Sequence, residues 1–349
     1  MPDLRRIFDA LLYYFILPFT AVSFVLTPLT NDTRIFLGAA AIADTYYQLP
    51  YGLDAAYEVK PIGNRILNWF LYKVADFVVP FASNHYTEFG YFVKLTALVI
   101  LIVCCWYVSS RVKTPYVFPL MFIGFACGGN FGLLMSEWFA AMFSLVAVAL
   151  LLEENRGWWQ VIAGMLCVGI ALLKSITVLM VIPVVCIVYL LGGEIDWKKF
   201  IGGYIAAGAA FLIACRTIWP YSLGDMLMSR LVAHVGMYDY TTMLTWFWLT
   251  QDRTNLLQVI LAYAPIIVAG FVAVVYLLFS SYARGDRKTA VLLSLLWLAP
   301  AAIVFIQSEY IIYHYLVFIP SALVSILLII NSAKYPMKTV AIVLILVMV

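Results

Sequence analysis

Apolar runs separated by short polar turns alternate along almost the whole chain. The longer of these runs are roughly 18–25 residues long, the length of helix that crosses ~30 Å of hydrocarbon. The pattern predicts an all-α integral membrane protein with about 10–11 transmembrane helices and no soluble domain. The expected spans are residues 7–29, 91–110, 115–128, 137–152, 158–173, 176–191, 200–218, 256–280, 289–307 and 316–330. A last apolar run, 339–349, is too short to cross a membrane by itself. This is the pattern expected of a chain that is truncated at its C-terminus.

Two long polar intervals interrupt this alternation. The first, residues 31–65, concentrates charge and opens an outer loop that we place at 30–90. The second, residues 219–255, mixes charges with many Trp and Tyr and is expected to lie partly in the membrane interface. Within the first loop, apolar residues recur at helical spacing, which predicts a helix lying in the interface with Asn68 and Asp76 on its other face. The recurring residues are Ile62, Ile66, Phe70, Val74 and Phe77.

Basic residues predict how the chain is oriented. Arg5 and Arg6 precede the first span, so the positive-inside rule places the N-terminus in the cytoplasm and both long intervals outside. The inner turns then hold most of the other basic residues: Arg111, Lys113, Arg156, Lys198, Lys199, Arg284, Arg287, Lys288, Lys334 and Lys338. A smaller set of basic residues lies on the predicted outer side, against the positive-inside rule, and a shared anionic ligand would explain their placement. These residues are Arg34, Lys60, Arg65, Lys174, Arg216, Arg230 and Arg253.

Composition supports the membrane assignment and excludes other classes. The chain is 65% hydrophobic and 11% charged, with a mean hydropathy of +1.00, values that a soluble domain does not reach. Its net charge is only +3 and its basic residues are scattered, so we expect no nucleic-acid partner. All six cysteines lie within apolar runs without metal-binding spacing, which favours buried thiols.

The predicted outer side combines two kinds of charged residue near the ends of spans. Carboxylates suit the deprotonation or orientation of a nucleophile, and Lys and Arg suit a phosphate or pyrophosphate. Together they favour transfer from a phosphorylated donor that meets the site at the membrane surface, for which a lipid-linked phosphate is the natural candidate. The acids are Asp32, Glu58, Glu137 and Glu309, and the bases are Lys60, Arg65, Lys174, Arg216 and His314.

Five strings in order along nearly the whole chain resemble the polytopic GT-C glycosyltransferases, particularly the protein mannosyltransferases and the lipid A aminoarabinose transferases. The strings are PLTNDTRIFLGAAAIA, YGLDAAYEVKPIGNRIL, LLMSEWFAAMFSLVAVALLLE, GIALLKSITVLMVIPVVCIVYLL and IIYHYLVFIPSALVSILLI. Asp32 matches the family's acidic residue after the first span. Glu58 and Lys60 match its E-K-P-P segment with Val59 inserted, and Glu137 matches the acid of its second outer loop.

Two further positions complete the likeness. Lys174 matches the lysine of the family's G-L-A-x-L-T-K turn, and His314 stands where its late R-Y-L-L-P string has Arg. The resemblance implies an inverting transfer of a sugar from a polyprenyl-phosphate donor to a lipid, glycan or protein acceptor on the extracytoplasmic face. It implies that Asp32 is the base and Glu137 a second acid near the site. A divalent metal is used by some of the related enzymes.

The resemblance also suggests roles for the remaining residues. Lys60, Arg65, Lys174, Arg216 and His314 would offset donor phosphate charge, and Glu58 and Arg34 would support the acceptor or the loop. Each residue also has a purely structural interpretation, such as an N-cap for Asp32, a helix-dipole contact for Glu137 or a snorkelling position for Lys174. At the level of the whole protein, the alternatives are a transporter or flippase of a lipid-linked sugar, and an assembly subunit without chemistry.

Overall fold

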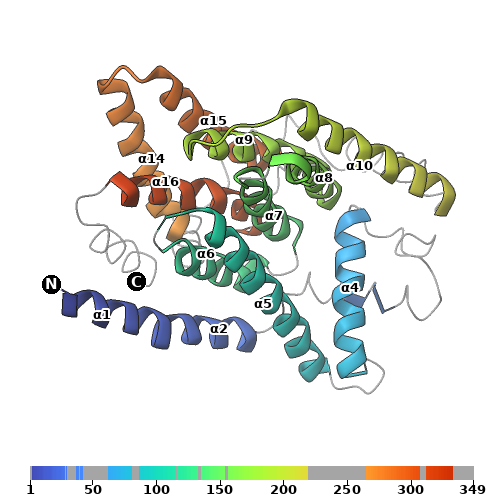
Figure 1. Ribbon diagram of the computed structural model, residues 1–349. Coiled ribbons are helices and arrows are strands. Elements are labelled where there is room, and N and C mark those ends of the chain that lie inside the picture. The colour runs from blue at the N-terminus through green and yellow to red at the C-terminus, as the bar shows by residue number, and fades with distance from the viewer. Residues whose placement is uncertain are drawn as a thin grey trace, which may run out of the picture.

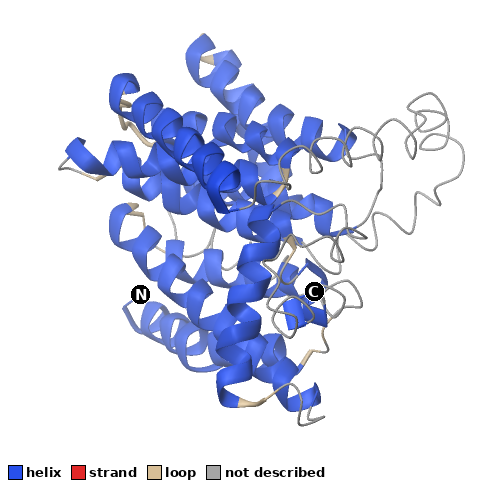
Figure 2. Ribbon diagram, turned by 90° about the vertical axis from the view of Figure 1, so that its right-hand side faces the viewer, coloured by secondary structure: helices blue, strands red, loops and turns tan. Residues whose placement is uncertain are grey.

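The computed structural model confirms the helical membrane fold. It describes residues 2–27, 29, 37–38, 40–41, 62–80, 86–114, 116–132, 135–153, 156–218, 265–306 and 312–332. These residues form helices joined by short turns, with no strand among them (Figure 2). A chain with so few polar side chains satisfies its backbone groups inside helices, which is what a bilayer requires of a spanning segment.

The helices follow the apolar runs closely (Figure 1). The first run forms α1, a π-helical turn η1 and α2 without interruption, and the run around Lys174 forms the predicted hairpin of α8 with η4 and α9. The elements are α1 Pro2–Leu11, η1 Leu12–Ile16, α2 Leu17–Leu26, α4 Ile62–Val78, α5 Tyr86–Arg111, α6 Val117–Gly132, α7 Ser136–Leu151, α8 Arg156–Leu173, η4 Ser175–Met180, α9 Val181–Leu190, α10 Trp197–Ile218, α14 Pro265–Ala283, α15 Arg287–Ile306, η5 Ile312–Phe318 and α16 Ile319–Ser332.

Within the described residues, 5 helices are long and apolar enough to cross a membrane. They are Arg5–Leu26, Thr87–Arg111, Pro265–Ala283, Arg287–Val304 and Tyr315–Ser332. Shorter apolar helices add Val117–Cys127, Ser136–Leu151, Gly157–Leu173 and Ile176–Leu190. The protein is therefore an all-α membrane protein. The total of about ten or eleven spans and the side on which each end lies stay predictions.

Helix α7 is the centre of the bundle (Figure 1). Nearly every residue from Ser136 to Leu151 is buried, and the helix packs against α5, α6, α8, α9, α16 and η5. A helix that is apolar all round can be buried on every face, and the alanines of α7 let its neighbours approach closely. Whatever polar side chain α7 carries must consequently find its partner inside the protein.

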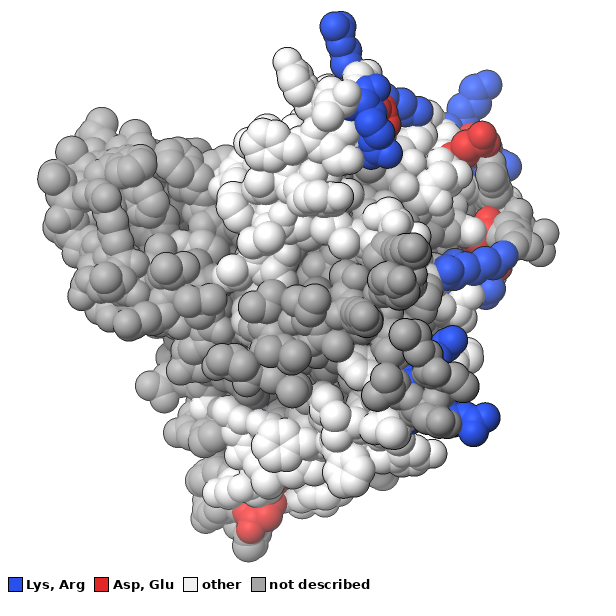
Figure 3. All heavy atoms as spheres, turned by 90° about the vertical axis from the view of Figure 1, so that its left-hand side faces the viewer, with Lys and Arg blue, Asp and Glu red and all other residues white. Residues whose placement is uncertain are grey.

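The periphery exposes apolar side chains, as a lipid-facing surface does. Only 11% of the residues in the apolar window of the first span are buried, and Phe19 on this span is 76% exposed. In Figure 3 the charged side chains of the described residues lie mainly along the upper and right-hand edge of the face shown, with acidic atoms also at the lower left, and the described atoms in the middle are uncharged. The five described cysteines, from Cys104 to Cys186, are free thiols that are buried or half-buried.

Helix α4 forms in the predicted place, but it faces the bundle with a different side. Three of the residues predicted to line its apolar face, Ile66, Phe70 and Phe77, are 40%, 49% and 91% exposed, and Val74 is half-buried. Asn68, expected on the opposite face, is buried against the protein together with Leu71 and Ala75. In a membrane protein an apolar face can turn outward to lipid, so the periodicity predicted the helix without predicting what each face contacts.

Helices α8 and α10 touch through glycine. A Cβ on Gly164 would lie 2.0 Å from the carbonyl oxygen of Phe200, and one on Gly203 would lie 2.1 Å from that of Val161. Such distances leave no room for any side chain, so the two backbones are in direct contact. Packing of this kind is common between transmembrane helices, where small residues replace the hydrophobic driving force.

The Gly164 contact can be tested against a matched glycine on α10. We expect Gly164→Ala to force α8 and α10 apart and to lower the free energy of unfolding by about 1–3 kcal/mol. Gly208, with nothing within 4 Å of its Cβ position, is the control: Gly208→Ala should leave stability unchanged or raise it slightly, since alanine favours helix. Unfolding of the purified protein in detergent, followed by tryptophan fluorescence, gives both values; equal behaviour of the two variants would contradict the packing.

Candidate functional site

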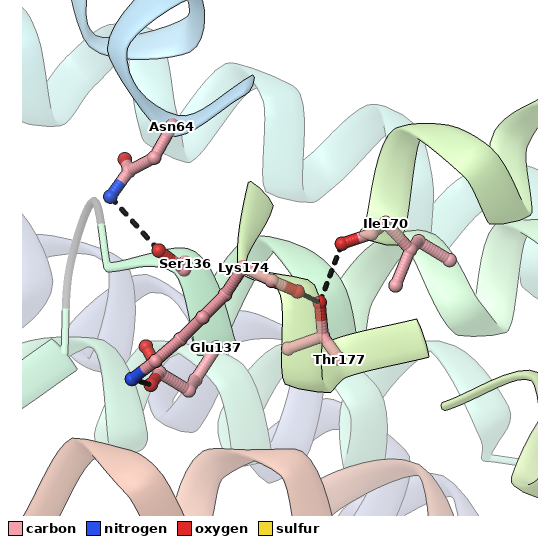
Figure 4. A network of polar contacts seen from close by, with 6 residues as sticks. All are labelled: Asn64, Ser136, Glu137, Ile170, Lys174 and Thr177. Atoms are coloured by element: carbon pink, nitrogen blue, oxygen red, sulfur yellow. Dashed lines mark hydrogen bonds and ion pairs between the residues drawn. The ribbon is translucent and has the colours of Figure 1, made fainter. Parts of the chain in front are cut away.

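A buried ion pair joins two of the residues that the sequence singled out. Lys174 Nζ lies 2.7 Å from Glu137 Oε1, and the side chains are 25% and 2% exposed, respectively (Figure 4). Glu137 comes from the first turn of α7, and Lys174 from the turn between α8 and η4. Ionised groups at membrane depth are costly unless they are paired, and they mark functional sites far more often than exposed ones do.

Local structure explains how Lys174 reaches Glu137. Lys174 is extended between two helices, with φ −160 and ψ 129, so its side chain leaves the hairpin toward α7. The Thr177 hydroxyl lies 2.6 Å from the carbonyl oxygen of Ile170 and also within reach of that of Lys174, and the Thr177 amide donates to the Lys174 carbonyl at 2.9 Å. Thr177 therefore ties the turn to the end of α8 and holds the lysine backbone in place (Figure 4).

Glu137 owes its position to the start of α7. The preceding Met135 is extended, so the helix begins at Ser136, and Glu137 lies in its first turn. A carboxylate there interacts favourably with the positive end of the helix dipole. Glu137 thus lies at a helix start, as its structural interpretation requires, and the pairing with Lys174 is an addition to it.

Helix α4 docks beside this pair. Asn64 Nδ2 donates to Ser136 Oγ at 2.9 Å, directly next to Glu137 (Figure 4). Asn68 Nδ2 donates in turn to the backbone carbonyl of Asn64 at 2.9 Å, while the buried Asn68 Oδ1 has no hydrogen-bond partner. A Cβ on Gly63 would lie 2.7 Å from the backbone of Leu172, so only glycine allows α4 to approach the end of α8 this closely.

The other predicted site residues lie beyond these contacts. Asp32, Arg34, Glu58 and Lys60 are outside the described residues. The backbones of Arg65, Arg216 and His314 belong to α4, α10 and η5, while their side chains are outside the described part. Their roles stay predictions, and so do the separate roles assigned to Glu137 and Lys174.

Sequence reasoning overlooked Lys94, a fully buried cation of α5. Its side chain is 2% exposed and donates to the backbone carbonyls of Phe24, at 2.9 Å, and Thr27. Those carbonyls end α2, where a cation also meets the negative end of the helix dipole. The ammonium lies 5.7 Å from the centre of the Phe24 ring, which stacks on Trp138 at 6.5 Å. The sequence does contain a signal for this residue, because Lys94 is the one lysine inside the apolar run 91–110.

The described residues contain no group of three or more His, Cys, Asp or Glu that could hold a metal ion. Comparison with known proteins adds no family: no family model, no curated protein and no solved structure matches the chain.

The ion pair can be measured by a double-mutant cycle. We expect Glu137→Gln and Lys174→Met each to lower the free energy of unfolding by about 3 kcal/mol, because each leaves the other charge buried without its partner. The double variant should lose clearly less than the sum of the two. Lys199→Met, which breaks an exposed 3.2 Å pair with Asp196, is the control and should have a far smaller effect. Strict additivity would mean that the two charges do not interact.

The contact between α4 and α7 gives a second prediction. Ser136→Ala removes the acceptor of the buried Asn64 amide and should destabilise the protein by about 1–3 kcal/mol. Ser144→Ala removes a hydroxyl that is equally buried in α7 but bonds only to its own helix, at the Ala140 carbonyl, so it should cost less. Equal losses in thermal unfolding of the two variants would show that the Asn64 contact contributes nothing.

Proposed function

We propose that this protein is a membrane glycosyltransferase that transfers a sugar from a polyprenyl-phosphate-linked donor to a lipid, glycan or protein acceptor. The observation that supports the proposal most is the buried Glu137–Lys174 pair at one end of a largely apolar bundle. The pair lies where α4, the helix that follows the charged 31–65 interval, contacts α7 and α8. Paired charges placed beside a charged loop suit a phosphorylated lipid that enters from the membrane.

The proposed reaction is an inverting displacement at the anomeric carbon. An acceptor oxygen forms the new bond to that carbon while the bond from the carbon to the donor phosphate oxygen breaks, and the electron pair leaves with the polyprenyl phosphate. Asp32 takes the proton of the acceptor hydroxyl in this scheme. Lys60, Arg65, Arg216 and His314 offset the growing phosphate charge. We place the reaction on the extracytoplasmic side of the cell membrane.

The geometry suggests different tasks for the paired residues. Glu137 is 2% exposed, so a ligand can hardly reach it, whereas Lys174 is 25% exposed. In our proposal Lys174 is the member of the pair that meets the donor phosphate, and Glu137 holds its ammonium in place. The contacts of Thr177 and Asn64 fix the two backbones from either side, so the ammonium is positioned before the donor arrives.

The test is sugar transfer by the purified protein in nanodiscs from a panel of polyprenyl-phosphate sugars, with and without EDTA. We expect one donor to be turned over and Asp32→Asn to lower kcat by roughly 10²–10⁴-fold while donor binding persists, as loss of a general base does. Asp44→Asn, in the same polar interval, should leave turnover within about twofold, since the sequence predicts that this carboxylate only caps or solvates the interval. Lys174→Met should raise the donor KM more than it lowers kcat.

Two results would overturn the proposal. Donor binding that is saturable and lost in Lys60→Ala and Arg65→Ala, without product from any donor, would indicate a transporter or flippase of the lipid-linked sugar. Absence of both binding and product would favour an assembly subunit. Inhibition by EDTA would add a divalent metal to the transferase mechanism.

A further inference from the structure

A polar cavity of about 660 Å³ opens at the end of the bundle opposite the Glu137–Lys174 pair. The last residues of four helices, α5, α7, α9 and α16, surround it. Its charged lining residues are Arg111, Lys113, Glu153 and Glu194. Glu137 and Leu151 stand at opposite ends of α7, which is ~24 Å long, so the cavity is a separate site.

The lining of this cavity carries two cationic and two anionic side chains, so its formal net charge is zero. Arg111 and Lys113 follow one another at the end of α5, and Glu153 and Glu194 follow α7 and α9. A lone anion or a lone cation bound there would leave a net charge in a half-enclosed space. A ligand that carries both an anionic group and an ammonium would meet complementary charges at each end.

One carboxylate oxygen of this cavity lacks a hydrogen bond. Glu153 Oε2 lies 2.6 Å from Arg111 Nε, yet the atom is buried and receives no hydrogen bond of acceptable geometry. The Arg111 guanidinium also lies over the Tyr107 ring, 5.6 Å from its centre, which holds its plane while its remaining N–H groups stay able to donate. A buried acceptor beside a held guanidinium provides both halves of a binding site for a zwitterion.

The cavity lies at the level of lipid headgroups. The candidate spans Thr87–Arg111 and Tyr315–Ser332 both end there, so the hydrocarbon boundary falls close to its rim. Leu152, Leu191 and Leu328 contribute apolar lining on the way in, which suits the first carbons of a lipid below its headgroup. A phospholipid diffusing in that leaflet reaches the cavity without leaving the membrane.

We propose that this cavity binds the headgroup of a zwitterionic phospholipid with a primary ammonium, of the phosphatidylethanolamine type. The phosphate lies against Arg111 and Lys113, and the ammonium donates to the accessible part of the Glu153 carboxylate, whose side chain is 12% exposed, and points toward Glu194. The negative ends of the surrounding helices favour the same placement of the ammonium. A trimethylammonium headgroup has no N–H to donate, so phosphatidylcholine fits the phosphate half of the site only. This inference is independent of the proposed function.

The test is native mass spectrometry of the detergent-purified protein after incubation with equal amounts of phosphatidylethanolamine, phosphatidylcholine and phosphatidylglycerol of matched acyl chains. We expect phosphatidylethanolamine to be retained at least about fivefold better than either of the others, the effect of one charge-assisted hydrogen bond. Glu153→Gln should remove this preference, whereas Lys113→Gln, which weakens the phosphate contact common to the three lipids, should lower the retention of all of them. Lys198→Gln, an exposed charge outside the cavity, should leave both the preference and the retention intact.

Leu328→Trp is a second variant that fills the cavity from α16 without altering any charge, and it should lower retention of phosphatidylethanolamine to the level of the other two lipids. Equal retention of the three lipids by the natural sequence would overturn the proposal. So would a preference that survives Glu153→Gln, Lys113→Gln and Leu328→Trp together, since the headgroup would then bind elsewhere.

Discussion

The burial of α7 on all sides is the constraint on which the rest of the structure depends. A helix surrounded by other elements on every side cannot expose a polar group to water, so each polar side chain on it needs a partner within the protein. Ser136, Glu137, Trp138 and Ser144 all have one. The helix that forms the apolar centre thus also gathers the buried polar contacts around its first turn.

Those contacts connect segments that are distant in the chain. Glu137 brings the turn after α8 to the start of α7, and Ser136 brings α4 to the same place. On the other side of α7, Trp138 stacks on Phe24, whose carbonyl is held by Lys94. The ends of α2, α4 and α8 are therefore all positioned by the first turn of one helix. A rigid frame of this kind can hold charged groups ready for a ligand, which is what phosphoryl recognition needs.

Charged side chains are buried at one end of the bundle and partly exposed at the other. At the start of α7 a single carboxylate and a single ammonium are taken out of water together, with exposed fractions of 2% and 25%. At the opposite end, four helices finish around a polar cavity whose cations and carboxylates remain partly exposed. Charge withdrawn from solvent at one end and charge left partly exposed at the other suit the two different ligands that we propose for these ends.

The sequence by itself determined the helical membrane fold, because the length of an apolar run states directly whether a helix can cross a bilayer. It also located the hairpin that carries Lys174 and the helix after the charged loop, and it selected Glu137 and Lys174 as notable charges. It did not determine that these two residues are partners, or that Asn64 bonds Ser136 and Lys94 bonds the end of α2. These pairs are separated by 37, 72 and 70 residues, respectively. Periodicity describes one helix at a time, so only the tertiary structure decided which helix faces meet. Helix α4 turns an apolar face outward, because lipid can solvate it, and buries Asn68 against the protein. Asn64, which lies one turn earlier, finds its acceptor on α7.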